Sequence, residues 1–146
     1  AKKLFMRILS LLLLTIFMGT GCSSQKKTDM TSTQIEYSAV SRGVYKKITV
    51  QNKIVSVVNG RNAQSVEKKI DDAKWKQIVA EFSKINLESI PTLKAPTEKR
   101  FHDGAAIGNL KITQDQKSYE TQGFDNGFPP KGIEKLVNLL TDFVKE

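Results

Sequence analysis

The polar side chains best suited to catalysis lie close together in residues 96–104, which have the sequence "PTEKRFHDG". This stretch contains the only histidine, His102, with Arg100 two residues before it and Asp103 directly after it. A histidine acting as general base, an aspartate that orients it and a cation for an oxyanion would form a hydrolytic site with water as the nucleophile. Adjacent side chains on an extended segment point in opposite directions, so Asp125 would be the orienting carboxylate if its loop meets this stretch. One hypothesis is therefore a small hydrolase that uses His102, Asp103 and Asp125.

The rest of the sequence offers less support for an enzyme. It contains no G-x-S-x-G nucleophile motif. A single histidine leaves only a carboxylate-rich metal site, and the residues around Asp125 lack the alternating ligands of an EF-hand loop. We therefore expect no metal and no cofactor. The interpretation we favour is that Asp103 and Gly104 form a turn, and that His102 is exposed or makes a local hydrogen bond.

A second turn-rich segment, "FDNGFPP" at residues 124–130, contains two aromatic side chains and two prolines. Phe124 and Phe128 would either form an exposed recognition patch or fix the start of the last helix in the core, and we favour the structural role. Arg100 would pair with Asp103 or with Asp125. If the chain has a binding surface, we expect it where the two loops meet, at Arg100, His102, Asp103, Phe124, Asp125 and Phe128.

The only cysteine, Cys22, follows a basic start, an uncharged run at residues 8–18 and three small residues. This order is typical of a secretory signal peptide, and the apolar run is shorter than the roughly 20 residues that span a bilayer. The sequence "GTGC" resembles the lipobox of bacterial lipoproteins, although Gly19 stands where that family prefers a leucine-like residue. The resemblance implies that Cys22 is alkylated with diacylglycerol, becomes the first residue of the mature chain and is acylated, for example with palmitate.

The resemblance divides the chain into a signal peptide (1–21), a flexible tether (22–33) and a single domain (34–146). It places the protein in the cell envelope, anchored to membrane lipid through Cys22. The tether has no acidic cluster after the cysteine, which in that family favours a domain that faces the periplasm. The mature domain, with its "APTEKRFHDGA" and "FDNGFPP" segments, resembles small exported lipoproteins of unassigned function. We therefore expect a binding or structural module with an envelope protein as its partner, and the hydrolase is the alternative.

Composition narrows the possible partners further. The formal net charge is +8, but the basic residues are scattered in pairs, which is typical of a solvated surface. Aromatic and basic residues do not alternate as they do in single-strand nucleic-acid binders, so nucleic acid is not expected as a partner. One cysteine forms no internal disulfide, and the domain must depend on its apolar core.

Hydrophobic periodicity predicts an α+β domain, with an antiparallel sheet of five or six strands and two amphipathic helices on one face. The expected order is β-β-β-β-α-β-β-α: strands at 34–41, 44–51, 53–58 and 62–69, a helix at 72–85, strands at 105–113 and 117–124, and a helix at 130–145. Tight turns are expected at Gln51-Asn52 and Asp115-Gln116. Asn59-Gly60 is the strongest signal for a type I′ hairpin, and Asp71 or Asp72 would cap the first helix.

Overall fold

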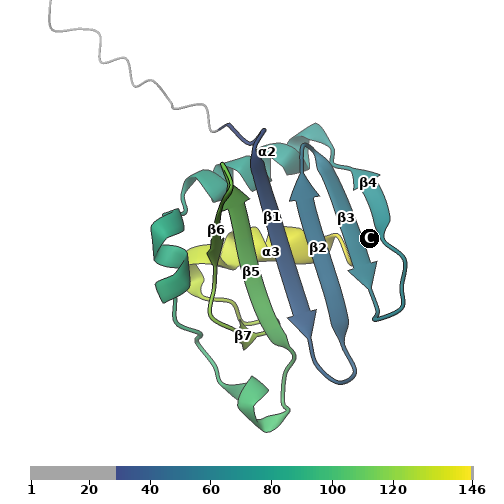
Figure 1. The fold of residues 1–146 in the computed structure, drawn as a ribbon, viewed down its shortest axis with the longest axis vertical. Helices are drawn as coiled ribbons and strands as arrows, with labels where there is room; N and C mark the ends of the chain where they lie inside the picture. Colours follow the sequence, from purple (N-terminus) through teal and green to yellow (C-terminus); the bar gives the residue numbers. More distant parts are fainter. Residues whose placement is uncertain (1–28, 146) are drawn as a thin grey trace, which may run out of the picture.

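The computed structural model describes residues 29–145. Cys22 and the expected signal peptide lie outside the described residues. The described chain folds into an open antiparallel sheet with the strand order β4-β3-β2-β1-β5-β6, and a short β7 also pairs with β5 (Figure 1). The strands are β1 (Thr33–Val40), β2 (Tyr45–Gln51), β3 (Ile54–Asn59), β4 (Val66–Lys69), β5 (Ile107–Gln114), β6 (Lys117–Glu120) and β7 (Phe124–Asp125).

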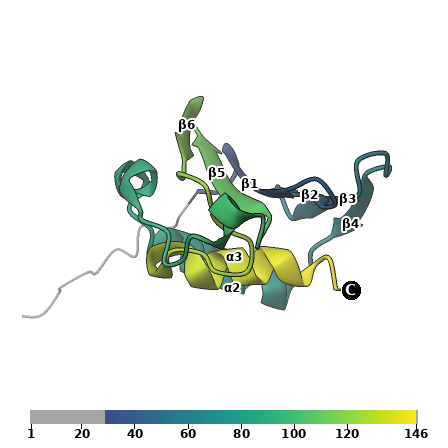
Figure 2. The ribbon, with the colours of Figure 1, turned by 90° about the horizontal axis from the view of Figure 1, so that it is seen from below.

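Two α-helices, α2 (Asp72–Ser83) and α3 (Glu134–Asp142), pack side by side against one face of the sheet (Figure 2). The predicted cap is confirmed for Asp71, whose carboxylate accepts a hydrogen bond from the backbone N–H of Lys74 at 2.7 Å. Three short 3₁₀ helices complete the fold: η1 (Leu87–Thr92), η2 (Lys99–His102) and η3 (Lys131–Ile133). None of the helices in residues 29–145 is long and apolar enough to cross a membrane.

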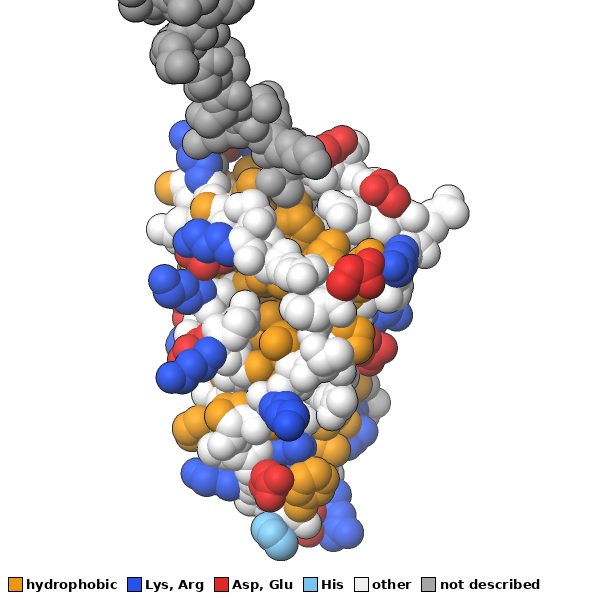
Figure 3. All heavy atoms as spheres, turned by 90° about the vertical axis from the view of Figure 1, so that its left-hand side faces the viewer, with side chains coloured by type: hydrophobic (Ala, Val, Ile, Leu, Met, Phe, Trp, Pro, Cys, Tyr) orange, Lys and Arg blue, Asp and Glu red, His pale blue; other side chains and the backbone are white. Residues whose placement is uncertain are grey.

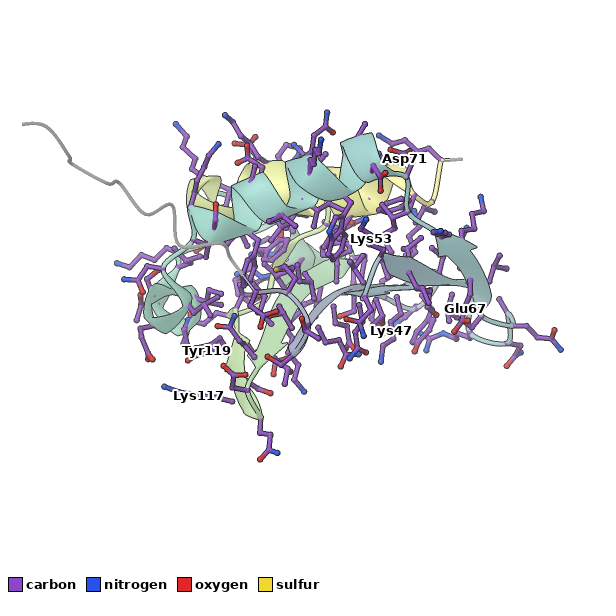
Figure 4. All side chains as sticks on the ribbon, turned by 90° about the horizontal axis from the view of Figure 1, so that it is seen from above. Lys47, Lys53, Glu67, Asp71, Lys117 and Tyr119 are labelled. Carbon is purple, nitrogen blue, oxygen red and sulfur yellow. The ribbon has the colours of Figure 1, made fainter. Side chains whose placement is uncertain are left out.

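The core lies between the sheet and the two helices. In β1, Ile35, Tyr37 and Ala39 are fully buried on the helix side, and the residues between them are partly exposed on the other side. This alternation is typical of an antiparallel sheet with one face in water. Lys47 points away from the helices on the exposed face (Figure 4). The predicted α+β class, the antiparallel sheet and the alternating pattern are therefore confirmed, but within residues 29–145 the sheet has seven strands and not the expected five or six.

The predicted order of elements is wrong at one point, because the expected strand 117–124 is two strands. The backbone N–H of Leu110 bonds to the side-chain oxygen of Thr121 at 2.9 Å instead of to a backbone carbonyl. This contact interrupts the β5–β6 ladder after Glu120, and pairing resumes at β7, where Phe124 lies opposite Gly108. The additional strand places Asp125 at the edge of the loop that precedes α3.

The predicted type I′ turn at Asn59-Gly60 is also wrong. Asn59 remains in β3 and pairs with Lys46, and the return strand β4 begins only at Val66. Two successive residues with positive φ angles, Asn52 (φ 49°) and Lys53 (φ 61°), join β2 to β3 instead. That turn lies one residue later than expected, and its Lys53 forms an ion pair with Asp72 at the start of α2, with 2.9 Å between Nζ and Oδ1.

The other predicted hairpin turn is confirmed. Asp115 (φ 49°) and Gln116 (φ 67°) connect β5 to β6. Gln114 pairs with Lys117 on either side of this turn.

Candidate functional site

The two loops predicted to form a site meet at a buried carboxylate. Asp125, in β7, is 0% exposed. Its Oδ2 accepts hydrogen bonds from the hydroxyl of Thr97 at 2.6 Å and from the backbone N–H of Lys99 at 2.7 Å. Its Oδ1 accepts from the backbone N–H of Arg100 at 2.9 Å and from the Arg100 guanidinium at 3.1 Å. Both oxygens are therefore fully engaged by residues 96–104.

This arrangement fixes the charge of Asp125. Burial raises the pKa of Asp125, but the hydrogen bonds from Thr97, Arg100 and Lys99 outweigh it and hold the pKa well below its ordinary value. The carboxylate also supplies acceptors to the first backbone N–H groups of η2, which have no partner within the helix. Asp125 is therefore an ionised anchor at neutral pH that caps η2 from a distant strand.

Arg100 completes this anchor. Its side chain is 11% exposed and makes the ion pair with Asp125, and its guanidinium also donates to the carbonyl of Thr97 at 2.7 Å. Of the two partners proposed for Arg100, the structure therefore selects Asp125 over Asp103. A buried ion pair with this many additional hydrogen bonds holds its loop in one geometry.

Phe124 is also an interior residue, so the expectation that Phe124 and Asp125 present side chains on a binding surface is wrong. The Phe124 ring is fully buried and packs against Tyr37 with 6.2 Å between ring centroids. It lies on the Cα of Gly108, where a β-carbon would come within 2.7 Å of the ring. Phe124 thus has the structural role that we favoured for both aromatic residues of this segment, whereas Phe128 is 46% exposed and does not.

The exposed residues Lys99, Phe101, His102 and Phe128, together with the largely buried Arg100 beneath Phe101, form a surface that we call the distal cluster. Phe101 is 67% exposed and Phe128 is 46% exposed, both high for such large apolar side chains. Lys99 Nζ lies 4.9 Å from the centre of the Phe128 ring, and the Arg100 guanidinium lies 4.3 Å from that of Phe101. Each exposed ring is therefore covered on one face by a cation.

The distal cluster lies at one end of the molecule. The described chain begins at the opposite end of β1, whereas η2 lies beyond the far end of the sheet (Figure 1). The histidine marks this tip in the space-filling view, beside acidic and hydrophobic side chains (Figure 3). Phe101 was not among the predicted site residues. The sequence feature that could have indicated Phe101 is an aromatic residue inside a basic loop that ends in glycine.

The predicted acid–base set does not come together. His102 is exposed, and its imidazole makes no hydrogen bond or ion pair with any residue that the structure describes. Asp103 is exposed and ends η2 in a left-handed conformation with φ 55°, which aspartate tolerates better than most residues. Asp125 has no free lone pair to orient the histidine. Within residues 29–145, no three His, Cys, Asp or Glu side chains gather as metal ligands.

A groove of about 330 Å³ lies between α3, the first two strands and the turn at residues 126–129. Buried Tyr37 reaches its wall, where the hydroxyl donates to Asn126 Oδ1 at 2.5 Å. Burial raises the pKa of Tyr37 to about 12, so the hydroxyl remains protonated and neutral. No residue of the 96–104 loop lines this groove. Sequence reasoning missed it because its lining comes from three separate parts of the chain.

No family model, no curated protein and no solved structure matches this chain. The function is therefore inferred from the geometry of the described domain and from the residues around Cys22.

Proposed function

We propose that this protein is a lipid-anchored component of a bacterial cell envelope whose domain binds another envelope protein through the distal cluster. The order of a basic start, an apolar run and "GTGC" supports the anchor. The polar residues 23–28 would tether the domain to Cys22, because the folded domain already includes Met30, which is 7% exposed, and Thr33, which begins β1. The absence of acidic residues directly after Cys22 supports a domain that faces the periplasm.

The observation that carries the binding role is the exposure of Phe101 and Phe128 on a rigid support. An exposed aromatic side chain stabilises the fold no more than an exposed polar residue would. Exposed apolar patches often mark interaction sites. Aromatic residues and arginine are also the residue types that dominate binding energy at protein interfaces. Because Asp125 already fixes η2, a partner would not need to order this loop, and less binding energy would be lost.

The position of the distal cluster supports the same proposal. The described chain begins at the end of the domain opposite the cluster (Figure 1). A domain anchored through residues before Thr33 would therefore direct the distal cluster away from its own membrane. A protein partner in the surrounding compartment fits this geometry better than the lipid surface itself. The hydrolase alternative has no comparable support, because the hydrogen bonds to Asp125 come from Thr97, Lys99 and Arg100 and none comes from His102.

The anchor can be tested by metabolic labelling with an alkyne-bearing fatty acid in a bacterial host. The wild-type protein should incorporate the label and fractionate with membranes, and Cys22→Ser should lose both properties. Ser24→Ala serves as the matched control and should be labelled like the wild type. Labelling of Cys22→Ser at the wild-type level would contradict the anchor.

The binding role can be tested by placing a photo-crosslinking amino acid at single positions in cells. A probe at Phe101 should give a discrete crosslinked product, whereas a probe at Lys68, exposed on β4, should not. Lys99→Glu should reduce the product at Phe101, because it replaces the cation over the Phe128 ring with an anion. Identical products at both positions, or none at Phe101, would refute a role for the distal cluster.

A further inference from the structure

The groove beside α3 has an unbalanced set of charges. Lys46 and Lys145 line it, and no aspartate or glutamate does. Its apolar part comes from the buried side chains of Ile48 on β2 and Val137 on α3, which lie beneath it, and from Val144, which follows α3 and is partly exposed. A concave surface that combines an apolar floor with a few polar groups of one sign is typical of a small-molecule site.

The charge of Lys46 is available to a ligand. Lys46 is half-buried on the helix side of β2, and it forms no ion pair or hydrogen bond with any side chain in the described part of the chain. The neighbouring Lys47 points to the other face, where it pairs with Glu36 at 3.0 Å. Lys145 is already paired with Asp142 at 3.1 Å. Of the two lysines that line the groove, Lys46 is therefore the one without an ion pair to any residue that the structure describes.

A second donor lies in the same groove. The Tyr37 hydroxyl donates to Oδ1 of Asn126, which leaves the Nδ2 amide group of Asn126 to donate elsewhere. That group makes no hydrogen bond to any residue between 29 and 145. Because burial keeps Tyr37 neutral, the hydroxyl adds no negative charge that would repel an anion.

We propose that this groove binds a small amphipathic carboxylate. Lys46 Nζ and Asn126 Nδ2 receive the carboxylate, and a short aliphatic chain lies against the partly exposed Val144, above the buried side chains of Ile48 and Val137. The volume of about 330 Å³ is at the lower end of the range for ligand sites, about 300–1,000 Å³, which favours a short chain over a long fatty acid. This site is separate from the distal cluster and does not depend on the proposed function.

The test is an NMR titration of the ¹⁵N-labelled protein with hexanoate, alongside acetate and 1-hexanol. Hexanoate should cause saturable shifts at Lys46, Asn126 and α3, with a Kd on the order of 1 mM. Acetate lacks the chain and 1-hexanol lacks the charge, so both should bind at least several-fold more weakly. If 1-hexanol binds as tightly as hexanoate, or hexanoate causes no saturable shift in the groove, the proposal is overturned.

Two substitutions test whether the charge of Lys46, and not a change in the fold, determines hexanoate binding. Lys46→Met retains the aliphatic stem and should weaken hexanoate binding about tenfold, the loss expected for one charge-assisted hydrogen bond. Lys47→Met, on the opposite face, is the matched control and should bind hexanoate as the wild type does. Wild-type affinity in Lys46→Met would overturn the proposal, and so would equal weakening in both variants.

Discussion

Gly108→Ala is expected to damage the centre of the fold although it adds a single carbon. Gly108 lies in β5 directly opposite Phe124 in β7. A β-carbon at this position would lie 2.7 Å from Phe124 Cε2, 3.0 Å from Cδ2 and 3.2 Å from the Tyr37 hydroxyl oxygen. Since carbon atoms prefer separations of about 3.5–4.0 Å, the ring would have to move by roughly 1 Å.

The surroundings leave little room for this movement. Phe124 is fully buried, and the next residue, Asp125, is held by hydrogen bonds from Thr97, Lys99 and Arg100. Overpacking of this kind costs about 1–3 kcal/mol, and alanine recovers about 0.4–1 kcal/mol by restricting the unfolded chain. These ranges allow a net loss between about 0 and 2.6 kcal/mol. Because the buried ring has little room to move, we expect about 1–2 kcal/mol, or a fall in Tm of about 3–10 °C for a domain of this size.

Urea denaturation and thermal melting of the purified protein measure this loss. Gly43→Ala is the control, because no atom lies within 4 Å of its added β-carbon and its φ is not positive; its stability should be unchanged or slightly higher. Phe124→Leu in the Gly108→Ala background should recover part of the loss, with a coupling energy of at least about 0.5 kcal/mol. If Gly108→Ala is as stable as Gly43→Ala, or if the two substitutions are additive, the steric reasoning is refuted.

Three further substitutions test the charges and the exposure. The folded protein lowers the pKa of Asp125. The stability that ionised Asp125 contributes is therefore fully present above pH about 3.9 and is lost as the pH falls through the pKa of the folded state. The difference in unfolding free energy between wild type and Asp125→Asn should therefore shrink from pH 5 to pH 2, and a constant difference would contradict this account. Burial raises the pKa of Tyr37 to about 12, so its contribution is full below pH about 10 and is lost as the pH rises through 12; between pH 8 and pH 11 the wild type should lose more stability than Tyr37→Phe. Phe101→Ser should change the unfolding free energy by less than about 0.5 kcal/mol, because the ring is 67% exposed, and a larger loss would mean that the ring stabilises the fold.

Periodicity predicted most of the sheet because one face of it is buried. The alternation of Ile35, Tyr37 and Ala39 with polar residues has the same period as the pleat, so it fixes both the strand and its inward face. The same reasoning succeeded for α2, where a capping aspartate marks the start. It failed at Thr121, because a side-chain oxygen in place of a backbone carbonyl leaves no trace in the hydrophobic pattern.

The positions of the turns were harder to predict, because the pairing register of the strands determines them more than the local turn preferences of the residues. Asn59-Gly60 has the residues of a type I′ turn, but the pairing of Lys46 with Asn59 keeps Asn59 in β3. Asn52 and Lys53 adopt positive φ angles instead, although lysine has little intrinsic preference for them. Pairing between the neighbouring strands fixes that turn, and this pairing is not visible in a four-residue window.

The role of Asp125 could be predicted only in part. The sequence indicated that the loops 96–104 and 124–130 could meet, and it offered Asp125 and Asp103 as alternative partners for Arg100. Its burial did not follow, because an aspartate beside asparagine and glycine usually indicates an exposed turn. Two of its four donors are backbone N–H groups, which every residue has, so the sequence contains no sign of which amides will point at the carboxylate.

The five residues from Phe124 to Phe128 place successive side chains in different parts of the molecule. Phe124 fills the core, Asp125 holds η2, Asn126 reaches the groove, and Phe128 lies in the distal cluster after Gly127 turns the chain with φ 92°. One short segment thus supports two separate surfaces. Coupling between two sites requires an element that has two arrangements of similar energy, and the bonds that hold Asp125 leave this turn only one. We therefore expect a ligand in the groove and a partner at the distal cluster to bind independently, so that saturating hexanoate leaves crosslinking through Phe101 unchanged.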